Sequence, residues 1–93
     1  MGYNLTIRPE ADIEISEALL WHEDQQVGLG LSLSREFREV INDIKEYPEH
    51  SQKRYRNIHI RFTKRFRYGI HYIIEENSIY VLAVLHTSRK PRK

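Results

Sequence analysis

The chain has 93 residues, which is enough for one small domain spanning residues 1–93 and too few for two. It has no cysteine, which excludes disulfides and thiolate metal sites and favours a reducing compartment. No apolar run approaches the roughly 18 residues that span a bilayer, and the N-terminus lacks the pattern of a secretory signal. We therefore expect a cytoplasmic protein with no membrane partner.

The formal net charge of +2 hides an uneven distribution of charge along the chain. Residues 1–50 carry four basic and eleven acidic side chains, whereas residues 51–93 carry eleven basic and two acidic ones. This asymmetry fits one surface that meets polyanions and another that meets solvent or a different partner. It equally fits two solvated surfaces of opposite sign that stabilise each other.

The first half of the chain predicts one strand and two helices. Alternating apolar residues predict a short strand over residues 3–7. A run of helix formers predicts a helix over residues 10–26, and Gly28-Leu29-Gly30 then predicts a tight connection. An apolar stripe predicts a second helix over residues 32–47, which Pro48 stops. Neither helix buries its stripe alone, so we expect an antiparallel helical hairpin.

In the second half the apolar period changes to two. It predicts strands over residues 58–62, 66–74 and 79–85, the last of them interior to the sheet because it is apolar on both faces. Tyr68 and Tyr72 fall on the core side. The predicted fold is a two-layer α+β sandwich of order β-α-α-β-β-β, with the helical hairpin on one face of a mainly antiparallel four-stranded sheet.

The parity of these strands predicts a cationic surface. If the apolar residues of 58–62 face the helices, then His59 and Arg61 face away from them. The same parity places Arg67 and His71 on this uncovered face. The alternative interpretation is that these arginines only keep the sheet soluble and that the histidines are structural.

A cationic sheet face is suited to nucleic acid. Arginine clamps phosphate through paired charged hydrogen bonds, so we expect His59, Arg61, Arg67 and Arg89 to form a nucleic-acid-binding set. Cleavage of RNA by its own 2′-hydroxyl needs a proton carrier and cations that stabilise the phosphorane. His86 is the obvious proton carrier, and the arginines are the charge stabilisers. The five histidines lack metal-ligand spacing and no glycine-rich phosphate loop is present, so we expect neither metal nor cofactor.

Several short motifs in this order of elements are informative together. They are Trp21-His22-Glu23 and Gly28-Leu29-Gly30 around the helical turn, Phe66-Arg67-Tyr68 with His71-Tyr72 on one strand, and Ala83-Val84-Leu85-His86 followed by Arg89 and Pro91. Over nearly its whole length the chain resembles the RelE/ParE toxin superfamily, the toxins of type II toxin-antitoxin systems, which include plasmid stabilization proteins. The resemblance implies a cognate acidic antitoxin that wraps the toxin in a hetero-oligomer.

Two branches of that superfamily act on different targets. The RelE-like branch cuts messenger RNA on the ribosome, and this resemblance would make His86, Arg67 and Arg89 catalytic. The ParE-like branch blocks DNA gyrase and needs no catalytic residues. No aromatic residue follows His86, and His59 and Arg61 stand where the nucleases carry paired lysines. These departures favour the ParE-like branch, with a non-toxic RNA-binding domain as a third alternative.

Overall fold

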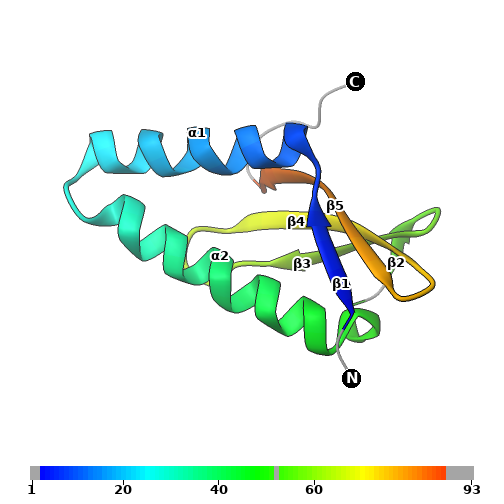
Figure 1. The fold of residues 1–93 in the computed structure, drawn as a ribbon. Coiled ribbons are helices and arrows are strands. Elements are labelled where there is room, and N and C mark those ends of the chain that lie inside the picture. The colour runs from blue at the N-terminus through cyan, green and yellow to red at the C-terminus, as the bar shows by residue number, and fades with distance from the viewer. Residues whose placement is uncertain (1–2, 52, 88–93) are drawn as a thin grey trace.

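A computed structural model describes residues 3–51 and 53–87 of the chain. Two long helices pack on one side of a twisted sheet (Figure 1), which confirms the two-layer α+β architecture. The elements in chain order are β1 (Asn4–Ile7), α1 (Pro9–Gln25), α2 (Leu29–Glu46), the 3-10 helix η1 (Pro48–His50), β2 (Lys53–Tyr55), β3 (Ile58–Phe62), β4 (Tyr68–Glu75) and β5 (Ser78–His86).

The sheet has five strands in the order β1-β5-β4-β3-β2. β1 runs parallel to β5, and the other neighbours are antiparallel. β5 therefore lies inside the sheet, as its apolar sequence predicts. The strand absent from the sequence prediction is β2, a three-residue edge strand that pairs with β3.

The helical hairpin closes around Gly28 and Gly30. Gly28 has a φ of 97°, a left-handed conformation that glycine adopts without a steric penalty. The Glu23 carboxylate of α1 accepts the backbone N–H of Gly28 (3.1 Å) and of Gly30 (2.9 Å), so it satisfies donors at the start of α2. A Cβ atom on Gly30 would lie 3.0 Å from the Leu19 carbonyl oxygen. The turn is thus shorter than predicted, because Leu29 and Gly30 already belong to α2.

The core lies between the helices and one face of the sheet. α2 contributes a buried stripe that includes Leu33, Phe37 and Ile44. β4 contributes Tyr68, Ile70 and Tyr72, which confirms that both tyrosines lie on the core side. β5 contributes Ile79, Val81 and Val84. Its register against β4 shifts by one residue after Val81, and this irregularity keeps both valines on the core side.

α1 covers an edge of the sheet as well as part of its face. β1 ends at Ile7, so the second half of β5 has no neighbouring strand on that side. The Glu14 carboxylate of α1 accepts the backbone N–H of Val84 there, at 2.8 Å. A helix side chain therefore takes the place of the missing strand.

Candidate functional site

The structure places His59 on the opposite side of the sheet from the prediction. His59 pairs directly with Tyr72 of the core, is only 6% exposed, and stacks on the Tyr72 ring at 5.2 Å. Its Nδ1 lies 2.8 Å from the Ser51 carbonyl oxygen. Because a carbonyl oxygen only accepts, Nδ1 carries the proton in this contact.

Arg61 is also on the core side, where it pairs with Ile70. Its Nε donates to the Ser51 hydroxyl oxygen at 2.5 Å, and its Nη2 donates to the Tyr47 carbonyl oxygen at 3.0 Å. Tyr47 directly follows α2, so the guanidinium lies at the negative end of that helix. The prediction that His59 and Arg61 lie on the uncovered face is therefore wrong.

The physical reason is the segment between α2 and β2. It runs beside β3 on the helix side and presents carbonyl and hydroxyl oxygens of Tyr47 and Ser51 to the imidazole and the guanidinium. These contacts give both polar side chains hydrogen-bond partners on the helix side of the sheet. The apolar residues of β3 consequently take the other face.

Two further predicted residues, His86 and Arg67, lie near the end of β5. His86 pairs with Tyr68 on the core side, and the two rings meet edge to face at 5.0 Å. Arg67 is exposed, has a φ of 62°, and accepts the Thr87 N–H on its carbonyl oxygen at 2.9 Å. Arg89 lies outside the described residues. Among the described residues, His59 and Arg61 thus share contacts with Ser51, and Arg67 and His86 lie at the loop end of β4 and β5.

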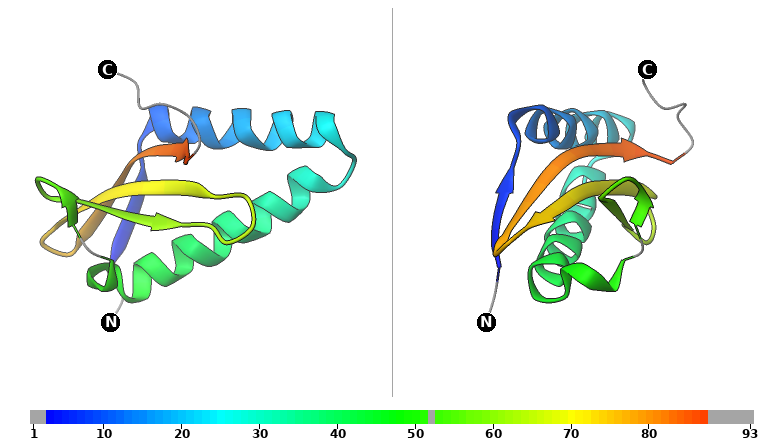
Figure 2. Two further views of the ribbon diagram at one scale, coloured as in Figure 1. Left: turned by 180° about the vertical axis from the view of Figure 1, so that it is seen from behind. Right: turned by 90° about the vertical axis from the view of Figure 1, so that its right-hand side faces the viewer.

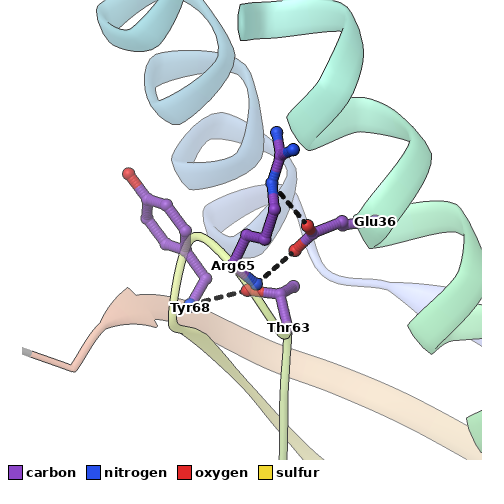
Figure 3. Close-up of polar contacts among 4 residues, drawn as sticks. All are labelled: Glu36, Thr63, Arg65 and Tyr68. Atoms are coloured by element: carbon purple, nitrogen blue, oxygen red, sulfur yellow. Dashed lines mark hydrogen bonds and ion pairs between the residues drawn. The ribbon is translucent and has the colours of Figure 1, made fainter.

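The loop that carries Arg67 is tied to α2. Figure 3 shows the Glu36 carboxylate between the backbone and the side chain of Arg65: it accepts the Arg65 N–H at 3.1 Å and lies 3.5 Å from its Nε. The Thr63 hydroxyl accepts the Tyr68 N–H at 2.9 Å, which closes the loop on itself. Lys64 and Arg67 are thus held exposed at this end of β3 and β4.

A half-open cavity of about 630 Å³ lies beside His59. Among the described residues, Nε2 of His59 has no hydrogen-bond partner, while Nδ1 is held by Ser51. Lys53 of β2 pairs with His59 and so lies on the same side of the sheet. Sequence reasoning missed Lys53, although its pairing with His59 would follow from recognising β2. The cavity is lined by Glu49, Ser51, Lys53, Asn57, His59 and Ile74.

A second missed residue is His22 of α1. Its Nε2 lies 3.1 Å from the Tyr68 hydroxyl, and its ring meets those of Trp21 and Phe66 edge to face, each at 4.9 Å. The motif Trp21-His22-Glu23 therefore joins α1 to the start of β4 and to α2. No local periodicity predicts these contacts, because His22 and Tyr68 are 46 residues apart.

The side of the sheet away from the helices carries mainly apolar side chains on β3, β4 and β5. We call it the open face and define it by Ile58, Ile60, Phe62, Ile73 and Tyr80, which share one side through the register of β3, β4 and β5. Figure 2 (left) shows β3 and β4 in front of the helices, with neither α1 nor α2 crossing this face.

Two further residues of β4 belong to the same side. A Cβ on Gly69 would lie 3.1 Å from atoms of both Ile60 and Phe62, so these side chains cover the glycine. His71 pairs with Ile60, as predicted for the uncovered side, and its Nδ1 is 3.5 Å from the Tyr55 hydroxyl. Burial lowers the pKa of His71 below its usual value, although the charge of Glu14 opposes this shift.

The helical hairpin also carries exposed apolar side chains, and one of them, Trp21, borders a cavity with Tyr68, Val84 and Leu85 of the sheet. The exposed apolar side chains of the hairpin have exposed fractions of 51% to 88% and follow α1 to the turn and into α2. α1 itself carries six carboxylates and neither lysine nor arginine. We call this the hairpin ridge and define it by Ile13, Leu20, Trp21, Val27 and Leu31.

A comparison with protein families matches residues 7–91 to the family described as "ParE toxin of type II toxin-antitoxin system, parDE". The chain belongs to the ParE toxin family. A search of the curated proteins found no match. Membership makes this chain the toxin of a type II toxin-antitoxin system and implies a cognate antitoxin as its partner.

The described part of this ParE-family toxin shows neither a membrane-spanning helix nor a group of metal ligands. Neither of its long helices, in the part of the chain that the structure describes, has the length and apolar character needed to cross a membrane. Within residues 3–51 and 53–87, no group of three or more His, Asp or Glu side chains is placed to hold a metal ion. What the described surface does offer is two apolar regions, the open face and the hairpin ridge.

Proposed function

We propose that this toxin arrests growth by binding DNA gyrase and blocking supercoiling, as the ParE-like branch of the superfamily does. The observation that carries the proposal is the hairpin ridge. Large apolar side chains that are more than half exposed, including a tryptophan, are typical of surfaces that bind other proteins. The burial of His59 and the hydrogen bonds of Arg61 to Ser51 and Tyr47 support the same choice, because a nuclease needs such groups exposed to a phosphate.

The test is gyrase-catalysed supercoiling of a relaxed plasmid in the presence of purified free toxin. We expect inhibition by the wild type and at least about tenfold weaker inhibition by Leu20→Glu, which places a charge on the hairpin ridge. Phe62→Glu is the matched control, since it adds the same charge to an exposed position on the open face. Normal supercoiling at excess wild-type toxin would remove the proposal.

A second candidate is ribosome-dependent cleavage of messenger RNA, and the cavity beside His59 favours it. There the Nδ1 contact with Ser51 leaves Nε2 as a proton acceptor, and Lys53 and Asn57 supply polar groups near it. This candidate expects cut messenger RNA from toxin-treated ribosomes. It also expects loss of toxicity in His86→Ala or Arg67→Ala with an unchanged circular dichroism spectrum, and persistent growth arrest in both variants would exclude the predicted catalytic roles.

A further inference from the structure

We propose that the half-open cavity beside His59 binds a small phosphorylated sugar, with the sugar hydroxyls at the base of the cavity and the phosphate at its rim. The gyrase proposal makes no use of this cavity, so the inference goes beyond that function and does not depend on it. It concerns a small molecule that the free toxin binds by itself.

The first step is the shape of the cavity. Its volume is about 630 Å³, which lies within the range of about 300 to 1,000 Å³ that is typical of sites for small ligands. At its base lie His59, which is only 6% exposed, and the partly buried Ser51 and Ile74. The rim consists of three exposed residues, Glu49, Lys53 and Asn57. The cavity therefore combines a buried base with a polar rim that a ligand can reach from solvent.

The second step is the imidazole of His59, which is fixed in place with one nitrogen unused. Its Nδ1 donates to the Ser51 carbonyl oxygen at 2.8 Å, and its ring stacks on the Tyr72 ring with the two planes only 15° apart. Tyr72 is anchored in turn, because its hydroxyl donates to the Pro48 carbonyl oxygen at 2.7 Å. Within residues 3–51 and 53–87, no group binds Nε2 and no buried polar side-chain atom lacks a partner. Nε2 therefore keeps contact with solvent, and it does so through the cavity that His59 lines.

This nitrogen determines which chemical group fits at the base. With the proton on Nδ1, Nε2 accepts hydrogen bonds, so the ligand must present a donor there. The Ser51 hydroxyl oxygen already accepts from Arg61 Nε, and its own proton remains to be donated. A sugar carries neighbouring hydroxyl groups that both donate and accept, so it matches these two side chains. Ile74 adds an apolar surface for the C–H groups of the same ring.

The third step is the charge at the rim. Lys53 supplies an ammonium group and Asn57 supplies amide N–H donors, which suit an anionic group such as a phosphate. Lys53 pairs with His59 across the two strands, so both side chains lie on the same side of the sheet. Glu49 contributes one carboxylate, which accepts from a hydroxyl and repels a ligand with several phosphates. One phosphate beside hydroxyl groups therefore fits this rim better than a polyphosphate or a nucleic acid strand does.

The experiment titrates the purified free toxin with ribose 5-phosphate and follows binding by calorimetry and by the nitrogen NMR signals of the imidazoles. We expect saturable binding that shifts the Nε2 signal of one histidine, and the loss of that signal in His59→Gln identifies it. Ribose and inorganic phosphate, added separately, should each bind at least about tenfold more weakly, because each makes only part of the contacts.

A second variant tests the rim. Lys53→Glu should bind ribose 5-phosphate at least about tenfold more weakly, because a charge-assisted hydrogen bond to the phosphate is replaced by repulsion. Lys64→Glu is the matched control with the same charge change, since Lys64 is an exposed lysine just beyond the other end of β3, and it should bind as the wild type does. Thermal melting shows whether each variant folds, and Lys53→Glu keeps the test decisive if His59→Gln unfolds.

The absence of saturable binding to the wild type would overturn the inference, and so would wild-type affinity in Lys53→Glu. A short single-stranded RNA that binds more tightly than ribose 5-phosphate and loses affinity in Lys53→Glu would also overturn it, because the cavity would then be a nucleic-acid site. Supercoiling is measured separately and without sugar phosphates, so failure of the gyrase proposal leaves this result readable.

Discussion

At the scale of single residues, His71 on the open face should make the free energy of unfolding depend on pH. Burial lowers the pKa of its imidazole, whereas the negative charge of Glu14 acts in the opposite direction. The folded state therefore binds this proton less readily than the unfolded chain does. The contribution of His71 to the free energy of unfolding should therefore be complete above its unfolded pKa of 6.5. It should decrease as the pH falls from 6.5 through the lower pKa of the folded state.

This dependence predicts the behaviour of His71→Gln. The variant lacks the titrating group, so its free energy of unfolding in urea should decrease less than that of the wild type between pH 7.5 and pH 5. His50→Gln is the control for the substitution itself, because His50 is an exposed histidine of η1. Equal slopes for the wild type and His71→Gln would contradict the prediction.

At the scale of elements, the helical hairpin depends on Gly30. A methyl group there would meet the Leu19 carbonyl oxygen at 3.0 Å and the Glu23 carboxylate at 2.9 Å. Gly30→Ala should force the two helices apart and displace the carboxylate from the start of α2. The overpacking costs about 1 to 3 kcal/mol. Alanine contributes up to about 1 kcal/mol in a helix interior and less near a helix start, so we expect a net loss of stability.

The measurement is the urea midpoint of unfolding. Leu31→Ala is the control, since Leu31 is the next residue of α2 and its side chain is more than half exposed. We expect a lower midpoint for Gly30→Ala and a nearly unchanged one for Leu31→Ala. A Gly30→Ala variant as stable as the wild type would show that the helices separate without cost.

The helices and most strands follow from sequence patterns, but the side of β3 that faces the helices does not. α2 was predictable because Leu33, Phe37 and Ile44 form one stripe, and β4 because its tyrosines alternate with polar residues. β3 alternates equally clearly, and yet its apolar side faces away from the helices. Alternation identifies two faces without saying which one the chain itself covers. The partners of His59 and Arg61 come from a separate segment, the one between α2 and β2, whose position no strand pattern reveals.

The site was less predictable than the fold for the same reason. The cavity beside His59 depends on β2, which is too short and too rich in basic residues to show an apolar period. The contact between His22 and Tyr68 depends on how the hairpin lies over the sheet. By contrast, His71 was correctly placed because its neighbours Ile70 and Tyr72 are unambiguous core residues.

At the scale of the whole molecule, the helical hairpin and the open face of the sheet carry different chemistry. The hairpin ridge combines apolar side chains with the carboxylates of α1, and the open face combines apolar side chains with cations at one end. The acidic and basic side chains that are separated along the sequence are therefore also separated in the folded structure. The fold separates the carboxylates of α1 from the cations at one end of the sheet, whereas the parity argument placed His59 and Arg61 on the open face itself.

The contact between Glu14 and Val84 predicts a coupled change in stability and solubility. Glu14→Ala leaves the Val84 N–H without this acceptor, which should cost about 1 to 3 kcal/mol. It also uncovers a strand edge that another molecule could extend, so light scattering at high protein concentration should rise. Glu17→Ala, a change at an exposed residue of the same helix, should alter neither property. Equal scattering from both variants would contradict this role.

That contact also limits how the toxin meets its target. α1 carries much of the hairpin ridge and, through Glu14, binds the backbone of Val84 in the unpaired part of β5. Moving the hairpin away from the sheet would therefore expose the backbone groups of that strand edge. Recognition by induced fit is thereby disfavoured. We expect the target to bind the hairpin in its present position, with no movement of the helices relative to the sheet.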